Sequence, residues 1–110
     1  MSKLLPRESV EQYRRDGFFF PIRVLSPAEA RQYRARLEAV ERELGGERSG
    51  ELRYKSHLLF TWLDTLVRHP AILDAVEELI GPDILCWGSG FFIKEARDSA
   101  FVSWHQDATY

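Results

Sequence analysis

A histidine and an aspartate stand two residues apart near the end of this sequence, in the run FVSWHQDATY at 101–110. The run is apolar and aromatic enough to predict a β-strand, in which residues i and i+2 project to the same face. His105 and Asp107 would then offer an imidazole nitrogen and a carboxylate oxygen to one point. These are two of the three donors in the 2-His-1-carboxylate triad, which holds non-haem Fe(II) and leaves positions open for oxygen chemistry.

The alternative interpretation is a surface strand that carries two unrelated polar residues, because a His-x-Asp pair on its own is a weak motif. The neighbouring aromatic residues Trp104 and Tyr110 suit a partly enclosed site better than an exposed edge. Spacing and neighbours thus support a metal site at His105 and Asp107, and the residues by themselves leave the surface strand open as the alternative.

Other residues that could do chemistry have ordinary structural interpretations. His69 precedes Pro70 and is typical of a helix start, and His57 is more typical of a packed or half-exposed polar residue than of a ligand. Lys55 is either a solvated charge or, in a site that uses a dicarboxylate cosubstrate, the partner of a carboxylate. Cys86 is the single cysteine, so an intrachain disulfide is excluded. We expect Cys86 to be a small buried hydrophobic residue rather than a nucleophile.

The composition is that of an ordinary globular chain. Its 110 residues are 45% hydrophobic and 29% charged, with a formal net charge of −2, and this length is enough for one small domain. The charge gives no reason to bind nucleic acid or an anionic membrane. No stretch has the roughly 18–20 apolar residues of a transmembrane helix, and the N-terminus lacks the apolar core of a signal peptide. We therefore expect a cytoplasmic protein.

Local signals predict helices in the first half. A helix is expected over residues 7–16, with Gly17 in the left-handed conformation after it. Ser26, Pro27 and Glu29 are typical of a helix start with a capping box. That helix is expected to end at residues 45–46, both glycine.

The middle of the chain continues this pattern. Residues 47–53 are polar and predict a loop, while 54–60 stay ambiguous. A short helical face follows, and Pro70 begins another helix that the Gly81-Pro82 pair ends. The short face consists of Trp62, Leu63, Leu66 and Val67.

Strands are predicted over 18–25, where Pro21 indicates an edge or an interruption, over 84–94, and from about 101 onward. Gly88 and Gly90 fall on one face of the second strand, so another group is expected to approach that backbone closely. Helices followed by strands predict an α+β fold or a helical preface to a β domain.

Several stretches of this sequence resemble the phytanoyl-CoA dioxygenase family. They are RHPAILDAVEELIGPD at 68–83, FIKEAR at 92–97 and the run at 101–110, preceded by a short helix, Gly-Phe-Phe, a turn and a long Arg/Glu-rich helix. The resemblance implies a double-stranded β-helix (a cupin-like jelly roll) with N-terminal helices packed on it. It also implies Fe(II), O₂ and 2-oxoglutarate as reactants, with a small molecule hydroxylated and succinate and CO₂ released.

Carried over to this sequence, the resemblance implies that His105 and Asp107 are iron ligands. Lys55, Phe92 and Gln106 become candidate contacts of 2-oxoglutarate. Asp107 favours oxygenation, because halogenating relatives have a small residue at the position of the carboxylate.

The resemblance also implies what these 110 residues would lack. The family's distal histidine ligand and its 2-oxoglutarate-binding arginine would lie beyond Tyr110. Residues 1–110 are therefore expected to be the N-terminal part of one dioxygenase domain, with a helical preface at about 1–82 and the first core strands at about 83–110. The alternative is a non-catalytic fragment or interaction module derived from the same family.

Overall fold

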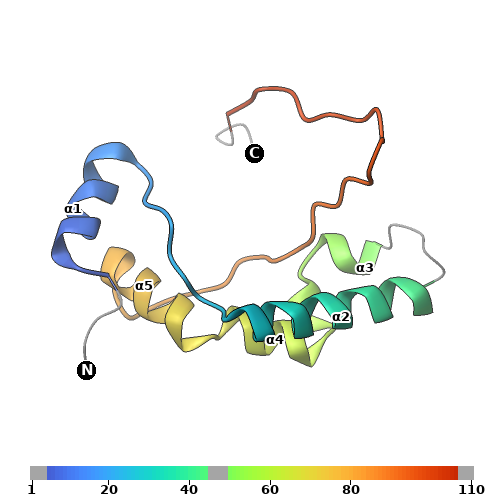
Figure 1. Cartoon of the computed structure of the whole chain (residues 1–110). Helices are drawn as coiled ribbons and strands as arrows, with labels where there is room; N and C mark the ends of the chain where they lie inside the picture. The colour runs from blue at the N-terminus through green and yellow to red at the C-terminus, as the bar shows by residue number, and fades with distance from the viewer. Residues whose placement is uncertain (1–4, 45–49, 107–110) are drawn as a thin grey trace.

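The computed structural model describes residues 5–44 and 50–106, and in this part of the chain every regular element is a helix (Figure 1). The elements follow one another along the sequence with short connections. They are α1 (Arg7–Asp16), α2 (Pro27–Glu43), α3 (Gly50–Arg53), the 3₁₀ helix η1 (Ser56–Leu58), α4 (Thr61–Val67) and α5 (Pro70–Ile80).

The first helix begins and ends where the sequence predicts, and the second begins where it predicts. Gly17 has φ 81° and its N–H donates to Tyr13 O at 2.8 Å, which closes α1. At the start of α2, Glu29 N–H donates to Ser26 Oγ at 3.2 Å, and Ser26 N–H donates to Glu29 Oε2 at 2.8 Å. These bonds satisfy backbone donors that the first turn leaves unpaired. The predicted end of α2 at residues 45–46 lies outside the described residues.

Helix α5 also has the predicted limits. His69 Nδ1 accepts a hydrogen bond from Ala71 N–H at 3.2 Å, which confirms His69 as a residue of the helix start. Gly81 has φ 87° and its N–H donates to Glu77 O at 2.9 Å. Pro70 at the first helical position costs no hydrogen bond, because the N–H it lacks has no partner within the helix.

The segment before α4 differs from its prediction. Residues 50–53 were expected in a loop and form the short helix α3. The ambiguous stretch 54–60 contains η1, which leads directly into α4. Lys55 lies between α3 and η1 with a left-handed backbone, φ 49° and ψ 36°, so one tight turn separates the two short helices.

The predicted α+β fold is wrong for the part of the chain that the structure describes. Residues 18–25, 84–94 and 101–106 contain no strand and join no sheet, so the expected start of a β-helix is absent there. Alternating apolar residues favour extended backbone, but a strand exists only where a second segment supplies its hydrogen bonds. Residues 84–94 instead bond to the α3–η1 region, through Leu52 and Ser56.

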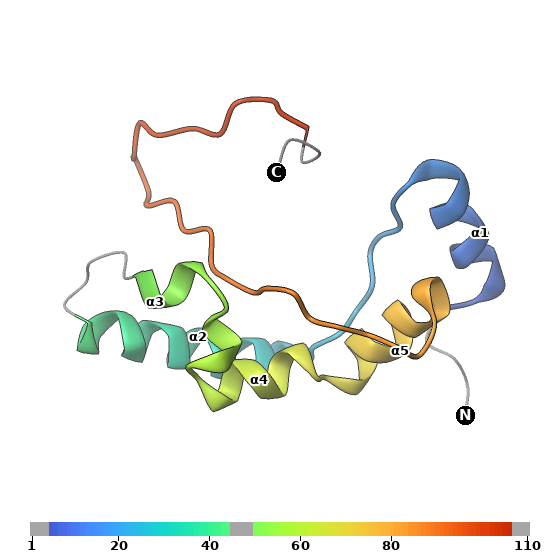
Figure 2. The ribbon, with the colours of Figure 1, turned by 180° about the vertical axis from the view of Figure 1, so that it is seen from behind.

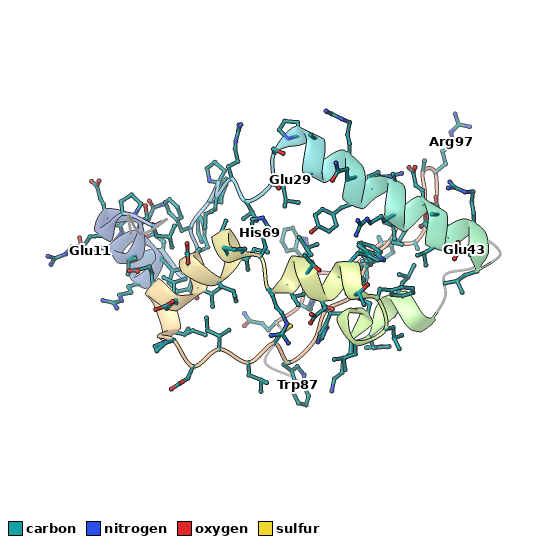
Figure 3. All side chains as sticks on the ribbon, turned by 90° about the horizontal axis from the view of Figure 1, so that it is seen from below. Glu11, Glu29, Glu43, His69, Trp87 and Arg97 are labelled. Atoms are coloured by element: carbon teal, nitrogen blue, oxygen red, sulfur yellow. The ribbon has the colours of Figure 1, made fainter. Side chains whose placement is uncertain are left out.

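Side chains pack in two regions. Leu5, Val10 and Ala75 form a buried apolar cluster, against which Phe19, Ile22 and Leu79 pack, so this cluster joins α1 to α5. On the other side, the rings of Tyr33, Phe60 and Phe91 surround Trp62, with centroids 6.1–6.3 Å from its own. This second group holds α2 alongside α4 (Figure 3). Among the described residues, no helix is both long and apolar enough to cross a membrane.

Residues 82–106 run as an extended segment from α5 back across the helices (Figure 2). This segment passes α3 and then leaves the helical layer, so its last described residues lie away from it (Figure 1). Candidate site residues therefore occupy two places, the α3–η1 region and the far part of the extended segment.

Candidate functional site

His105 lies in the far part of the extended segment and is exposed. Its Nδ1 is 2.8 Å from the carbonyl oxygen of Ser103. Because a carbonyl oxygen can only accept, Nδ1 carries the proton of this hydrogen bond, and in a neutral ring the lone pair then resides on Nε2. Histidines that bind metals commonly have this arrangement, with one ring nitrogen donating to a carbonyl and the other facing the ion.

Asp107, the predicted second ligand, lies outside the described residues, so the pairing of its carboxylate with His105 stays a prediction. Within residues 5–44 and 50–106, no group of three or more His, Cys, Asp or Glu side chains gathers as a metal site would require. His57 and His69 both have structural partners, as their sequence context predicts.

Lys55, the predicted contact of a carboxylate, is exposed beside a tryptophan. Its Nζ lies 4.6 Å from the centroid of the Trp87 ring. An ammonium over an indole face is attracted by the ring's negative charge density, with an energy of about 0.5–1 kcal/mol where both groups are exposed. Among the described residues, no carboxylate forms an ion pair with Lys55. Its ammonium is therefore oriented by a ring rather than neutralised by an acid.

Phe92 and Gln106 complete the predicted set, and both are exposed, Phe92 at 82%. Phe92 follows the part of the extended segment that contacts α3 and η1. Gln106 is next to His105, in the part that Figure 1 shows well away from α3 and η1. Within the described residues, the structure thus places Lys55 near the segment that leads to Phe92, and places His105 and Gln106 apart from them.

A cluster that sequence reasoning missed anchors the extended segment, and we call it the Ser89 cluster, comprising Ser56, His57 and Ser89. Ser89 Oγ lies 2.6 Å from His57 Nδ1 and 3.3 Å from Ser56 Oγ, and it accepts a hydrogen bond from His57 N–H at 3.2 Å. Ser56 and His57 are buried, with 1% and 8% of their surfaces exposed. Sequence spacing gives no signal for these bonds, because they join residues 32 and 33 positions apart.

Backbone contacts on either side reinforce this anchor. Ser56 N–H donates to Ser89 O at 3.2 Å, and Phe91 N–H donates to Leu52 O at 2.8 Å. A Cβ on Gly90 would clash with the backbone oxygen of Arg53, so the predicted close approach is confirmed at this glycine. Gly88 has open space around it, and the prediction is wrong there.

Cys86 also departs from its prediction of a buried hydrophobe. It is exposed, and its Sγ–H donates weakly to Gly88 O at 3.5 Å. Hydrogen bonds hold the extended segment against α3 and η1 at residues 89–91. Cys86 lies three residues before these bonds, and its side chain is at the surface.

The sequence model of the phytanoyl-CoA dioxygenase family matches residues 13–110. The chain is also 29% identical over 106 residues to a protein of Streptomyces griseoviridis named L-proline trans-4-hydroxylase. That alignment covers 90% of this chain and 40% of the relative. No solved structure matches the chain.

Proposed function

The chain belongs to the phytanoyl-CoA dioxygenase family, and from this premise we propose that it is the N-terminal part of an Fe(II)- and 2-oxoglutarate-dependent dioxygenase. The family and the hydroxylase relative are of the Fe(II)/2-oxoglutarate oxygenase type. The reaction proposed here is hydroxylation of a small molecule by O₂, with succinate and CO₂ as coproducts. Because the chain spans 40% of the relative's length, this reaction belongs to the full-length protein.

The observation that carries the proposal is the extent of the family match. It runs to residue 110 and so includes the Trp-His-Gln-Asp motif at 104–107. A His-x-Asp pair by itself is weak, but the same pair within a matching family sequence of this length is far more specific. The match therefore supports His105 and Asp107 as iron ligands.

The chemistry of the donors suits Fe(II). The Ser103 carbonyl fixes the His105 ring in the form that keeps the lone pair on Nε2, and Asp107 would add a carboxylate oxygen. A facial triad requires one more histidine, and we propose that it comes from outside these residues. Bound Fe(II) would supply O₂ activation coupled to decarboxylation of 2-oxoglutarate.

The other proposed roles concern binding. Lys55 would form an ion pair with a carboxylate of 2-oxoglutarate through its exposed ammonium, a charge-assisted contact stronger than a neutral hydrogen bond. Phe92 and Gln106 are the other two proposed contacts of 2-oxoglutarate, one an aromatic wall and the other an amide. The described residues place Gln106 apart from Lys55 and Phe92, so the three contacts would have to come together in the full-length protein. L-proline is the first substrate to test, because the matching Streptomyces protein is named for it.

The test is succinate formation by the full-length protein with Fe(II), 2-oxoglutarate, O₂ and L-proline, compared with its H105A variant. We expect turnover in the wild type and a loss of at least about a hundredfold in H105A, since loss of a ligand removes both binding and chemistry.

His69→Asn is the matched control for this test. It also removes an imidazole, but asparagine is a favoured helix-capping residue, so α5 should keep its start. Control activity should stay within about twofold of the wild type. Equal turnover in wild type and H105A would contradict the role of His105. Absence of succinate with every small-molecule substrate would favour the interaction module.

A further inference from the structure

The Ser89 cluster lies beside the two residues that form the Lys55–Trp87 contact. Lys55 immediately precedes Ser56, and Trp87 is two residues before Ser89. The bonds between Ser56, His57 and Ser89 thus join the turn that carries the ammonium to the segment that carries the ring.

Every side chain of the cluster can have a hydrogen-bond partner at the same time. His57 N–H donates to Ser89 Oγ. If the Ser89 hydroxyl donates its single proton to His57 Nδ1, at 2.6 Å, the Ser56 hydroxyl remains to donate to Ser89 O, at 3.4 Å, or to Ser89 Oγ. The network is partly buried, since Ser56 and His57 are buried and Ser89 is half-buried, and a network with every member paired favours one geometry. Ser89 Oγ is the atom common to these side-chain contacts.

The side chain of Trp87 is not held in place by packing. It is 79% exposed, and Figure 3 shows its side chain pointing away from the helices. Its place over Lys55 therefore depends on the backbone of residues 87–91, which the Ser89 cluster and the Phe91–Leu52 bond hold against residues 52–57.

We infer that Ser89, held by Ser56 and His57, is a positioning residue that keeps the Trp87 ring beside the Lys55 ammonium and so raises the affinity for a dicarboxylate cosubstrate. This inference rests on the proposed function, in which Lys55 binds 2-oxoglutarate. A free lysine side chain loses rotamer entropy when it binds an anion. A lysine already oriented by a ring loses less, which is the general advantage of preorganisation.

The experiment uses the full-length protein with its lysines reductively dimethylated with ¹³C. The NMR signal that disappears in Lys55→Arg identifies Lys55, and the ring current of Trp87 should shift this signal from the free-lysine position. In Ser89→Ala, we expect the signal to move toward the free-lysine position. We also expect KM for 2-oxoglutarate, measured on unmodified protein, to rise roughly two- to fivefold, the affinity ratio that an exposed cation–π contact represents. The kcat should stay within about twofold, because no group at the proposed metal ligands changes.

Further variants separate positioning from general loss of structure. Ser89→Thr retains the hydroxyl and should restore both the Lys55 signal and KM. Trp87→Leu changes an exposed side chain and leaves the Ser89 cluster intact, so it should fold and still lose the ring-current shift and raise KM. The matched control is Ser99→Ala, an exposed serine in the same segment, which should behave as the wild type.

The outcomes also separate this inference from the proposed function. If the wild type forms succinate while Ser89→Ala and Trp87→Leu keep both the Lys55 signal and KM, the inference is wrong and the proposed function stands. The inference is also wrong if the Lys55 signal moves in these variants while KM for 2-oxoglutarate is unchanged. The Lys55–Trp87 contact would then have no effect on binding of the cosubstrate. If the wild type forms no succinate and 2-oxoglutarate does not perturb the Lys55 signal, proposed function and inference fail together.

Discussion

At Gly90 the extended segment leaves no room for a side chain against α3. An added Cβ would clash with Arg53 O and would lie 2.8 Å from Arg53 C, and both atoms belong to the backbone. Backbone cannot turn aside as a flexible side chain can, so the segment itself would have to shift. We predict that Gly90→Ala lowers the free energy of unfolding by about 1–3 kcal/mol, the usual cost of overpacking.

Urea denaturation measures this change, and Gly88→Ala is its matched control. Gly88 is two residues away with nothing within 4 Å of the added Cβ, so that variant should be neutral or more stable by up to about 1 kcal/mol. Equal destabilisation by the two substitutions would show that residue 90 is not in close contact with α3.

At the scale of single residues, the sequence predicts local properties of a residue but not its distant contacts. Paired glycines in an apolar run indicate that something approaches the backbone, and this holds for Gly90. The identity of the approaching group depends on a contact with residues more than 30 positions earlier, as the Ser89–Ser56 bond illustrates. Residue types therefore predicted that a group approaches the backbone but not which group. They likewise predicted a packed or half-exposed His57 but not its hydrogen bonds to Ser89.

Helix α2 shows how a local signal leads to a testable element. Ser26 and Glu29 satisfy each other's backbone N–H, and hydrogen bonds from the Ser26 side chain and backbone hold the pKa of Glu29 below its ordinary value. A carboxylate with a lowered pKa in the folded state contributes stability above the unfolded pKa, about 4.3 for glutamate. That contribution is lost as the pH falls through the folded pKa.

We therefore predict that Glu29→Gln makes the unfolding free energy fall less steeply below about pH 4.3 than it does in the wild type. Glutamine keeps the capping geometry and does not titrate. Urea denaturation between pH 3 and pH 7 is the measurement. A wild-type profile for Glu29→Gln would contradict the prediction.

Helices were predictable and strands were not, because their hydrogen bonds have different ranges. The start of α5 at Pro70 and the end of α1 at Gly17 depend on residues within one turn. The alternation over 84–94 also predicts a local property, extended backbone, but it cannot say what that backbone pairs with. Here the partners among the described residues lie in the α3–η1 region, so the expected sheet does not form.

At the scale of the whole molecule, the chain is more open than a compact domain of its length. Its radius of gyration is 16.4 Å, against about 13 Å for a compact domain of roughly 100 residues. The buried apolar cluster of α1 and α5 shares no residue with the aromatic group around Trp62. Two separate packed regions should respond independently to substitution.

A double-mutant cycle tests that independence. Val10 belongs to the α1–α5 cluster, and Leu63, 4% exposed, belongs to α4. We predict that the effects of Val10→Ala and Leu63→Ala on the unfolding free energy add to within about 0.5 kcal/mol, as expected for distant sites. Val10→Ala with Leu79→Ala is the matched pair within one cluster and should show a coupling of about 0.5–3 kcal/mol. Coupling of Val10 to Leu63 as strong as its coupling to Leu79 would mean that the two regions form one core, with α4 packed against α1 or α5.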